Sequence, residues 1–320
     1  MKKAVVGLAV TFSTLTATID ARAQEERAFD PDLGVLSTGR MLKAPKAART
    51  FSPSSPGRVV PGQALDALAN FKARSESAAE AAAKTHLKPV TAPVGRETII
   101  GADTRTRVSP TTSYPARATV LITFSDGRCT GWLINANTVV TAGHCIHPGG
   151  SGGAFYPTSS YRVSPGYNGT SAPYGSCTAR WTVTTNGWAA NGDDRYDYGA
   201  IRLNCQIGRT TGWYGFFWTA TTLTGLPTVI NGYPGDKPLT QWRSTDLVRL
   251  TQAQRLFYQN DTTGGMSGSP VYYNRSGCGV CAMAVHTYGL YGSPPFSTNN
   301  HGTRITRAVY DNLVAWQNAP

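Results

Sequence analysis

The sequence predicts an all-β fold, and three observations carry that prediction. Residues 98–320 number 223, enough for one domain of two packed halves. Short β-rich runs recur through this part of the chain and are separated by turn residues. Near the C-terminus, about 303–317, apolar residues recur at helical spacing, and no other segment of this part reads as a helix. We therefore expect a β-rich domain that ends in an α-helix.

The expected strands follow one another at intervals typical of all-β barrels. They are 118–124, 130–134, 138–142, 200–203, 228–232, 270–273 and 282–286. The terminal helix is predicted from the spacing of Ile305, Val309, Leu313 and Trp316, which places these side chains on one face.

The first 23 residues have the pattern of a secretory signal peptide. Lys2 and Lys3 form a basic start, residues 4–15 are mostly apolar, and 21–23 read Ala-Arg-Ala, a small-x-small cleavage site. The apolar run is shorter than the roughly 20 residues that a membrane span needs. We therefore expect a secreted, extracellular product with no membrane partner.

Three short motifs predict a catalytic serine. His144 lies in Thr-Ala-Gly-His-Cys, Asp197 follows 53 residues later, and Ser267 lies 70 residues beyond it in Gly-Gly-Met-Ser-Gly-Ser-Pro. A serine hydroxyl is a poor nucleophile unless a base takes its proton, and a third group must orient that base. The order His, Asp, Ser is that of the double-β-barrel serine proteases and differs from that of subtilisins and α/β-hydrolases. Backbone N–H groups of Gly265 and Ser267 are expected to hold the oxyanion.

The six cysteines all lie beyond residue 128, and an even number in an exported chain favours disulfides. Six cysteines allow 15 pairings, so the sequence alone does not choose among them. The favoured pairs are Cys278–Cys281 as a small loop, Cys129–Cys145 beside the histidine and, by elimination, Cys177–Cys205. A zinc site that uses the Cys-x-x-Cys pair is the alternative, but the chain has no second close pair.

Residues 24–97 differ in composition from the rest. They contain no cysteine, tryptophan or tyrosine, and the alanine-rich run 64–83 favours an amphipathic helix. Low aromatic content argues against an independent core. We interpret this part as a pro-segment that keeps an exported protease silent during synthesis, and a disordered tail is the alternative.

The whole chain has a formal net charge of +12, and residues 98–320 have 16 Lys and Arg against 9 Asp and Glu, or +7. The arginines are dispersed singly, which favours a solvated basic surface over a nucleic-acid site. A positive field of this kind also attracts acidic substrates. We expect protein or peptide substrates, the chain's own pro-segment as a partner, and a monomer. No metal or organic cofactor is expected, and Asp193 and Asp194 are interpreted as solvated loop charges rather than a calcium site.

Glutamate is missing from the second part of the chain. All five glutamates lie before residue 98: Glu25, Glu26, Glu76, Glu80 and Glu97. Roughly a dozen would be expected in the remaining residues from average usage. A protease that cuts after glutamate persists longer if its mature chain lacks that residue, and it leaves a glutamate where it releases itself. Glu97, directly before Thr98, fits such a junction; a compositional bias of the lineage is the alternative.

The substrate pocket gives two opposing indications. Asp261, six residues before Ser267, occupies the position that predicts cleavage after lysine or arginine in this architecture. Against that, His286 lies in a segment, 282–289, that is expected to line the pocket. A histidine there can donate a charge-assisted hydrogen bond to a carboxylate, and Thr262 can add a hydroxyl. A buried structural histidine is the alternative for His286.

Met266 occupies the position directly before the nucleophile. Trypsin-like zymogens are activated when a new N-terminus pairs with an aspartate at that position. Activation must therefore work differently here, and the α-amine of Thr98 is available for substrate recognition.

These residues together resemble the secreted bacterial glutamyl endopeptidases of the chymotrypsin superfamily, over nearly all of 98–320. The motifs that carry the resemblance are 100–101, 105–108, 129–132, 141–145, 164–166, 168–170, 197–201, 232–237, 264–270, 284–287 and 302–306. The resemblance implies two six-stranded antiparallel barrels, about 98–210 and 225–300, and then the helix.

The resemblance also implies the chemistry. His144, Asp197 and Ser267 would be the triad of an acyl-enzyme mechanism, and His286 with Thr262 would recognise a glutamate side chain. Relatives with the short Cys-x-x-Cys loop also carry aspartate at position 261, which weakens the trypsin-like interpretation. We therefore expect a serine endopeptidase that cuts after glutamate and more weakly after aspartate. A trypsin-like or broad specificity and a catalytically inactive binding protein are the alternatives.

Overall fold

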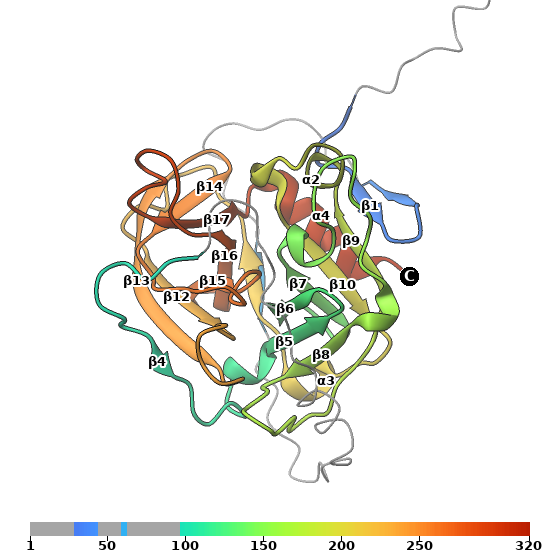
Figure 1. Ribbon diagram of the computed structural model, residues 1–320, viewed down its shortest axis with the longest axis horizontal. Helices are drawn as coiled ribbons and strands as arrows, with labels where there is room; N and C mark the ends of the chain where they lie inside the picture. Colours follow the sequence, from blue (N-terminus) through green and yellow to red (C-terminus); the bar gives the residue numbers. More distant parts are fainter. Residues whose placement is uncertain (1–28, 44–58, 63–96) are drawn as a thin grey trace, which may run out of the picture. The chain divides into compact units, whose positions relative to one another are not determined.

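Two groups of antiparallel strands carry the fold (Figure 1). The computed structural model describes residues 29–43, 59–62 and 97–320. The predicted signal peptide and the predicted helix 64–83 lie outside the described residues. Residues 31–320 form one compact unit, and the description below concerns that unit.

The first sheet holds the strands of the N-terminal half. In spatial order they are β2 (Met41–Leu42), β1 (Gly34–Leu36), β9 (Ala179–Thr185), β10 (Gly199–Leu203), β7 (Thr138–Thr141), β6 (Gly127–Leu133), β5 (Thr119–Phe124) and β8 (Arg162–Pro165). A bridge between Val163 of β8 and Cys177 brings the far edge back beside the start of β9. Strands β5 to β10 thus curl into the first barrel.

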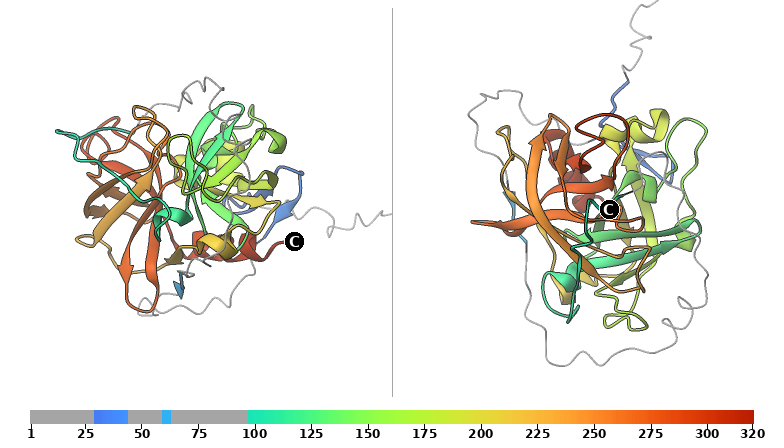
Figure 2. Two further views of the ribbon diagram at one scale, coloured as in Figure 1. Left: turned by 90° about the horizontal axis from the view of Figure 1, so that it is seen from below. Right: turned by 60° about the vertical axis from the view of Figure 1, so that its left-hand side comes forward.

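The second sheet closes on itself. Its order is β15 (Pro270–Arg275), β12 (Pro227–Gly232), β13 (Trp242–Thr251), β14 (Arg255–Tyr258), β17 (Asn300–Arg304), β16 (Gly279–Tyr288), β11 (Gly215–Phe217) and β3 (Val59–Val60), and β4 (Thr106–Arg107) pairs with β13. Because β15 also pairs with β16, six strands form a closed barrel. Figure 2 shows the two groups of strands from two further sides. The prediction of an all-β fold with two barrels is confirmed.

Helices are few in the described part of the chain. They are α2 (Asn186–Asn191), α3 (Gly208–Thr211), α4 (Arg307–Asn318) and the short 3-10 turns η1 (Ala116–Ala118), η2 (Gly143–Cys145), η3 (Thr158–Ser160) and η4 (Asp194–Tyr196). The helix expected over about 303–317 begins later, because Thr303 and Arg304 belong to β17. The side chain of Thr306 caps α4 by accepting a hydrogen bond from Val309 N at 3.3 Å.

Several strands were not expected from the sequence: β8, β9, β11, β13, β14 and β17. Strand β13 shows why. It carries Arg243, Asp246 and Arg249, and most of its other side chains also face solvent at least partly, while Ser244 and Val248 point inward. A strand of this composition pairs on both sides without showing an apolar run.

Part of the predicted pro-segment belongs to the sheets. Strand β1 pairs with β9, and β3 pairs with β11. Gly34 of β1 lies close against the terminal helix, since a Cβ atom there would be 2.7 Å from Trp316 Nε1. These short strands are added to the outer edges of the two barrels.

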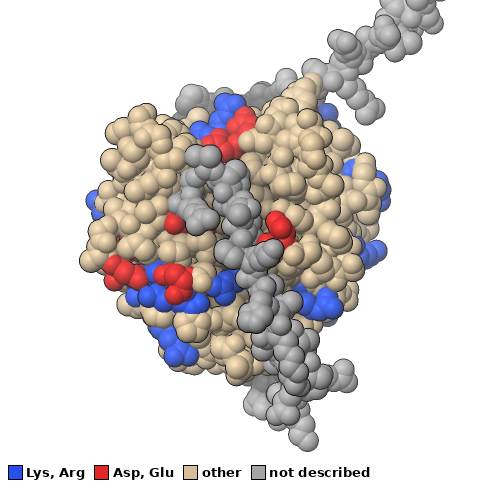
Figure 3. Space-filling view, in the orientation of Figure 1, with Lys and Arg blue, Asp and Glu red and all other residues tan. Residues whose placement is uncertain are grey.

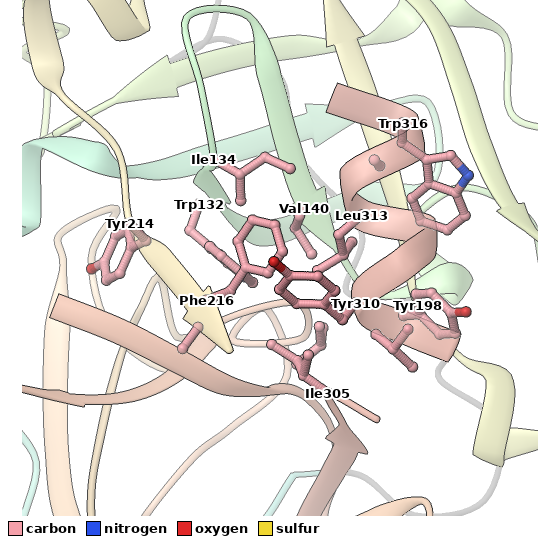
Figure 4. Close-up of a cluster of buried hydrophobic side chains, with 14 of the residues drawn as sticks. Trp132, Ile134, Val140, Tyr198, Tyr214, Phe216, Ile305, Tyr310, Leu313 and Trp316 are labelled. Atoms are coloured by element: carbon pink, nitrogen blue, oxygen red, sulfur yellow. The ribbon is translucent and has the colours of Figure 1, made fainter. Parts of the chain in front are cut away.

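A buried apolar cluster joins the two barrels and α4 (Figure 4). Trp132 and Val140 come from the first barrel, Phe216 comes from β11 of the second sheet, and Leu313 and Trp316 come from α4. Burying side chains of this size stabilises by about 1.5–3 kcal/mol each. The last helix therefore packs on the first barrel although it follows the second in sequence.

Charged side chains are mixed on the surface. On the face shown in Figure 3, blue and red groups lie beside one another. Arg195, for example, pairs with Asp193, and Arg249 pairs with Asp246. Not all of the dispersed arginines lie on the expected solvated surface, because Arg105, Arg117, Arg202 and Arg304 are buried. Among the described residues, no helix has both the length and the apolar character to cross a membrane.

Three disulfides join Cys129 to Cys145, Cys177 to Cys205, and Cys278 to Cys281. These are the pairs that the sequence analysis favoured, and the described residues include no free cysteine. The Cys278–Cys281 thiols are therefore not zinc ligands.

Loop length predicts how much two of these disulfides contribute. Replacing Cys177 and Cys205 by serine opens a 28-residue loop, and the chain-entropy relation gives a loss of about 3–4 kcal/mol in the free energy of unfolding. The matched change at Cys278 and Cys281, which are three residues apart, is expected to cost about half as much. Urea unfolding at pH 7, in a Ser267→Ala background that cannot digest itself, measures both. Equal losses would contradict the loop-length argument.

Candidate active site

His144 and Asp197 form a buried pair between two short turns. His144 lies in η2, directly after β7, and Asp197 follows η4. The His144 Nδ1 atom is 2.7 Å from Asp197 Oδ2, and the His144 backbone N–H donates to Asp197 Oδ1 at 2.8 Å. One carboxylate thus fixes both the ring and the backbone of the histidine. Gly143 permits this approach, since a Cβ atom there would be 3.0 Å from Asp197 Oδ1.

The protonation of His144 follows from its neighbours. Burial alone would lower its pKa, but the carboxylates of Asp197 and Glu97 outweigh burial, and the pKa of His144 is raised. Nδ1 faces Asp197, so Nε2 is the ring atom that remains to exchange a proton with a nucleophile.

Ser267 lies in the loop between β14 and β15, and glycines set the shape of that loop. Gly265 has φ +99° and Gly268 has φ +85°, conformations that side chains disfavour. At Gly268 a Cβ atom would lie 2.2 Å from the carbonyl oxygen of Thr130. The Ser267 carbonyl accepts a hydrogen bond from Thr130 N at 2.9 Å, which joins this loop of the second barrel to β6 of the first.

Two backbone N–H groups beside the nucleophile donate to none of the described residues. The amides of Met266, Gly268 and Ser269 all make backbone hydrogen bonds, whereas those of Gly265 and Ser267 make none. These are the two groups expected to hold an oxyanion.

Glu97 lies at the nucleophile. Its carboxylate accepts a hydrogen bond from Ser267 Oγ, and no described hydrogen bond joins Ser267 Oγ to His144. Glu97 is buried, and burial raises its pKa, although Ser267 and His144 act in the opposite direction. The sequence analysis assigned Glu97 to a cleavage junction; it did not anticipate that this side chain would contact the serine.

Asp261 does not present a charge to a pocket. Its carboxylate accepts three hydrogen bonds, from Ile100 N at 2.8 Å, Thr104 N at 2.8 Å and Thr104 Oγ1 at 2.6 Å. Asp261 is 1% exposed. Its carboxylate is therefore used to anchor residues 100–104.

His286 and Thr262 are buried and retain unpaired polar atoms. His286, on β16, donates its backbone N–H to Ser269 O at 2.9 Å and accepts at its carbonyl from Gly268 N at 2.8 Å, which places it beside the nucleophile loop. His286 Nε2 and Thr262 Oγ1 have no hydrogen-bond partner among the described residues. Burial, together with His301 and His144, lowers the pKa of His286 to about 3, so the ring is neutral at pH 7.

Thr98 lies between the segments that carry these atoms. Its backbone N–H donates to Asn300 Oδ1 at 3.2 Å, and its carbonyl accepts from Asn300 Nδ2 at 2.6 Å and from Thr262 N at 3.3 Å. Its hydroxyl accepts from Leu290 N at 3.2 Å. The structure thus brings Thr98 and Thr262 together through their backbones.

Two residues at the site were not found from the sequence. Asn300 anchors Thr98, and Tyr258 makes a hydrogen bond to the His286 ring, with Tyr258 Oη 2.8 Å from Nδ1. Both lie on strands, β17 and β14, that the sequence analysis did not predict. A tyrosine or asparagine in an unassigned segment gives no signal by itself.

The acidic pair 193–194 is occupied by arginines. Asp193 pairs with Arg195 and Asp194 with Arg255, and Tyr291 Oη donates to Asp194 at 2.9 Å. In the described part of the chain, one group of three side chains has metal-ligating atoms within 4.8 Å of one another: Cys129, His144 and Cys145. Its two cysteines form a disulfide and are not free to bind a metal.

Comparisons with known proteins agree with this geometry. The trypsin-like peptidase domain family matches residues 129–281. A Bacillus licheniformis glutamyl endopeptidase is 48% identical over 236 residues, which cover 72% of this chain and 72% of that protein. A solved structure of a Glu endopeptidase in complex with MPD superposes with a TM-score of 0.63 at 29% identity, covering 69% of this chain and 100% of that one.

One relative has a discordant name. A Bacillus subtilis protein named extracellular metalloprotease is 44% identical over 228 residues, covering 69% of this chain and 70% of that protein. In the described part of this chain, the one group with metal-ligand geometry has both cysteines in a disulfide. His144 and Asp197 form the kind of buried pair that a serine protease uses, and Glu97 interacts with both Ser267 and His144.

Buried neutral histidines predict acid sensitivity. His301 is 1% exposed and stacks on Phe257 and Tyr288, and burial followed by Arg255 lowers its pKa to about 3. The unfolded chain, with a histidine pKa of about 6.5, takes up the proton first. The contribution of neutral His301 to the free energy of unfolding is therefore fully present above about pH 6.5 and is lost as the pH falls toward 3.

Replacing His301 by phenylalanine keeps an aromatic ring and removes this proton uptake. The decline in the free energy of unfolding below pH 6.5 is expected to become shallower, by on the order of 1.4 kcal/mol per pH unit. Urea unfolding at several pH values in the Ser267→Ala background measures it. If the free energy of unfolding declines with pH equally in the proteins with and without His301→Phe, proton uptake by His301 is not the cause of the acid sensitivity.

Proposed function

We propose that this chain, which belongs to the glutamyl endopeptidase family of trypsin-like serine proteases, is exported as a precursor and hydrolyses peptide bonds after glutamate. One observation carries the specificity. The carboxylate of Asp261 accepts hydrogen bonds from three donors, while His286 Nε2 and Thr262 Oγ1 are buried and have no partner among the described residues. A site with unused donors and a carboxylate whose two oxygens are already paired suits an anionic side chain better than a cationic one.

The reaction follows from the geometry of the buried pair. In the mature enzyme Ser267 Oγ attacks the scissile carbonyl, and His144 Nε2 accepts its proton and later protonates the leaving amine. Asp197 holds the ring through Nδ1 and stabilises the imidazolium. The N–H groups of Gly265 and Ser267 stabilise the oxyanion, and losing one such donor typically costs about 10²–10³ in turnover. Water then hydrolyses the acyl-enzyme.

A trypsin-like specificity is disfavoured by the pairing of Asp261. A lysine or arginine side chain needs a carboxylate with free acceptor positions. The three donors from Ile100 and Thr104 already occupy both oxygens of Asp261, so a basic side chain would have to compete with them.

A substrate glutamate would instead find donors in the pocket. His286 Nε2–H and the hydroxyl of Thr262 bind its carboxylate, and both atoms are buried. A hydrogen bond to a charged group is worth about 1.5–3 kcal/mol. Aspartate substrates are poorer because their carboxylate reaches one methylene less far, which costs roughly 1–3 kcal/mol.

Processing between Glu97 and Thr98 adds a positive charge. The new α-amine of Thr98 arises at an atom held beside Asn300, close to Thr262, and Asp261 keeps residues 100–104 anchored after the cut. A cation at this position attracts the substrate carboxylate and complements the neutral His286.

Before processing, Glu97 keeps the serine inactive. While Ser267 Oγ donates its hydrogen bond to the Glu97 carboxylate, it does not donate to His144. Glu97 also raises the pKa of His144, so its departure makes this histidine a more available base at neutral pH. Purified mature enzyme is expected to begin at Thr98. The pro-segment 24–97 is thus a partner of the site and carries the inhibitory residue at its end.

A peptide library that varies the residue before the cut tests the specificity. His286→Ala is expected to lower kcat/KM for glutamate peptides by roughly 10- to 100-fold relative to alanine peptides, because it removes one donor to the carboxylate. Active enzyme is counted with an organophosphate, and Ser267→Ala is the blank. Equal losses for all peptides would assign His286 a structural role, and a preference for lysine or arginine in the unchanged enzyme would refute the proposal. Binding of peptides without any hydrolysis would favour the inactive binding protein.

Two variants at position 97 test the inhibition. Glu97→Ala and Glu97→Gln are both expected to leave the precursor uncut at Thr98, as N-terminal sequencing will show. Only the glutamine keeps an acceptor for Ser267 Oγ. The alanine precursor is therefore expected to react with an organophosphate several-fold faster, up to about 10-fold. Equal labelling rates of the two precursors would contradict an inhibitory contact.

A further inference from the structure

His286 is held in place by its backbone and by one side chain. Its N–H and carbonyl are bonded to Ser269 and Gly268, and its ring Nδ1 lies 2.8 Å from Tyr258 Oη. Tyr258 reaches the ring from β14 because Gly302 of β17 leaves space for it. A Cβ atom at Gly302 would lie 2.9 Å from the tyrosine oxygen.

The direction of this hydrogen bond follows from the burial of both partners. Tyr258 is fully buried, and among the described residues its hydroxyl is paired with His286 Nδ1. If Tyr258 accepted the bond, its own proton would be left unpaired, at a cost of about 1–3 kcal/mol. Burial, followed by the charge of Glu97, raises the pKa of Tyr258 well above its ordinary value, so the proton stays on the oxygen. Tyr258 therefore donates and His286 Nδ1 accepts.

The acceptor role of Nδ1 determines the other ring nitrogen. Burial and the charges of His301 and His144 lower the pKa of His286 to about 3, although a contact with the backbone of His301 acts in the opposite direction, and the ring is therefore neutral at pH 7. A neutral imidazole with an acceptor at Nδ1 carries its proton on Nε2. That is the buried atom without a partner, and it is a donor. The opposite tautomer would turn a lone pair toward a bound carboxylate and repel it.

We propose that Tyr258 is a specificity-determining residue that acts through His286: its phenolic proton selects the tautomer that presents Nε2–H to the carboxylate of a substrate glutamate. This inference rests on the proposed function. Tyr258 does not touch the substrate; it is a positioning residue. It allows a neutral histidine to recognise an anion, with no need for the ring to be protonated beforehand.

Tyr258→Phe removes the phenolic proton and keeps the ring that packs in the second barrel. We expect the ratio of kcat/KM for glutamate peptides to that for alanine peptides to fall about 10- to 100-fold, the value of one hydrogen bond to a charged group. Tyr114→Phe is the matched control, because Tyr114 Oη also donates one hydrogen bond, to Trp213 O at 2.9 Å, away from the site. Its ratio is expected to stay within about 3-fold of the unchanged enzyme.

A double-mutant cycle separates a role through His286 from a role in packing. In the His286→Ala background, Tyr258→Phe is expected to change the ratio by less than about 3-fold, because the residue it orients is gone. An unchanged ratio in Tyr258→Phe alone, or a full loss in both backgrounds, would overturn the role of Tyr258. If the unchanged enzyme shows no glutamate preference, the proposed function itself fails, and this inference fails with it.

A spectroscopic measurement keeps the inference testable if Tyr258→Phe does not fold. In ¹⁵N-histidine-labelled Ser267→Ala protein, the resonances assigned to His286 are expected to show a protonated Nε2 and an unprotonated Nδ1 at pH 7. A proton on Nδ1 would overturn the inference, whatever the substrate preference of the active enzyme.

Discussion

The buried carboxylate of Asp261 governs the arrangement of the whole site. An unpaired buried charge costs several kcal/mol, so the second barrel is stable only while Ile100 and Thr104 supply donors to it. That requirement holds the start of the protease domain against the barrel. As a consequence Thr98 lies beside Asn300, and the residue before it reaches Ser267. The same interaction removes the one carboxylate that would have selected basic substrates.

The unpaired polar atoms of the site indicate which chemical groups it would bind. Buried polar groups are normally satisfied, and each exception calls for an explanation. Around the nucleophile these exceptions include Nε2 of His286 and the hydroxyl of Thr262, and the amides of Gly265 and Ser267 also make no hydrogen bond to the described residues. The amides match a developing oxyanion. The other two match a side chain that brings acceptors, and Tyr258 makes the histidine a donor. A cationic side chain brings only donors, so it could pair with the oxygen of Thr262 but not with the two amides or with the Nε2–H of His286.

The sequence was sufficient for the fold class, and its motifs supplied the residues from which the proposed site is built. The motifs of His144, Asp197 and Ser267 follow one another in the order of the double-β-barrel serine proteases. Apolar strands such as β5 and β7 indicated the all-β fold. The rest depends on tertiary contacts. Strand β13 was not predicted because its polar composition resembles that of a loop. The terminal helix was predicted to begin too early because β17 pairs on both sides and extends to Arg304. The pairing of Asp261 with residues 100–104 joins segments about 160 residues apart, and no local pattern reports it.

Glu97 has two roles in the proposed function: it is the residue recognised before the cut, and its carboxylate restrains Ser267 before processing. A glutamate bound productively would direct its carboxylate toward His286 and its carbonyl toward Ser267. Here the carboxylate itself meets the serine hydroxyl, so the chain in this conformation does not present the bond after Glu97 for attack. Burial raises the pKa of Glu97, which means that holding the ionised form at the serine is unfavourable relative to water. Burial therefore opposes the restraint, and under the proposed processing no glutamate remains in residues 98–320 to replace Glu97.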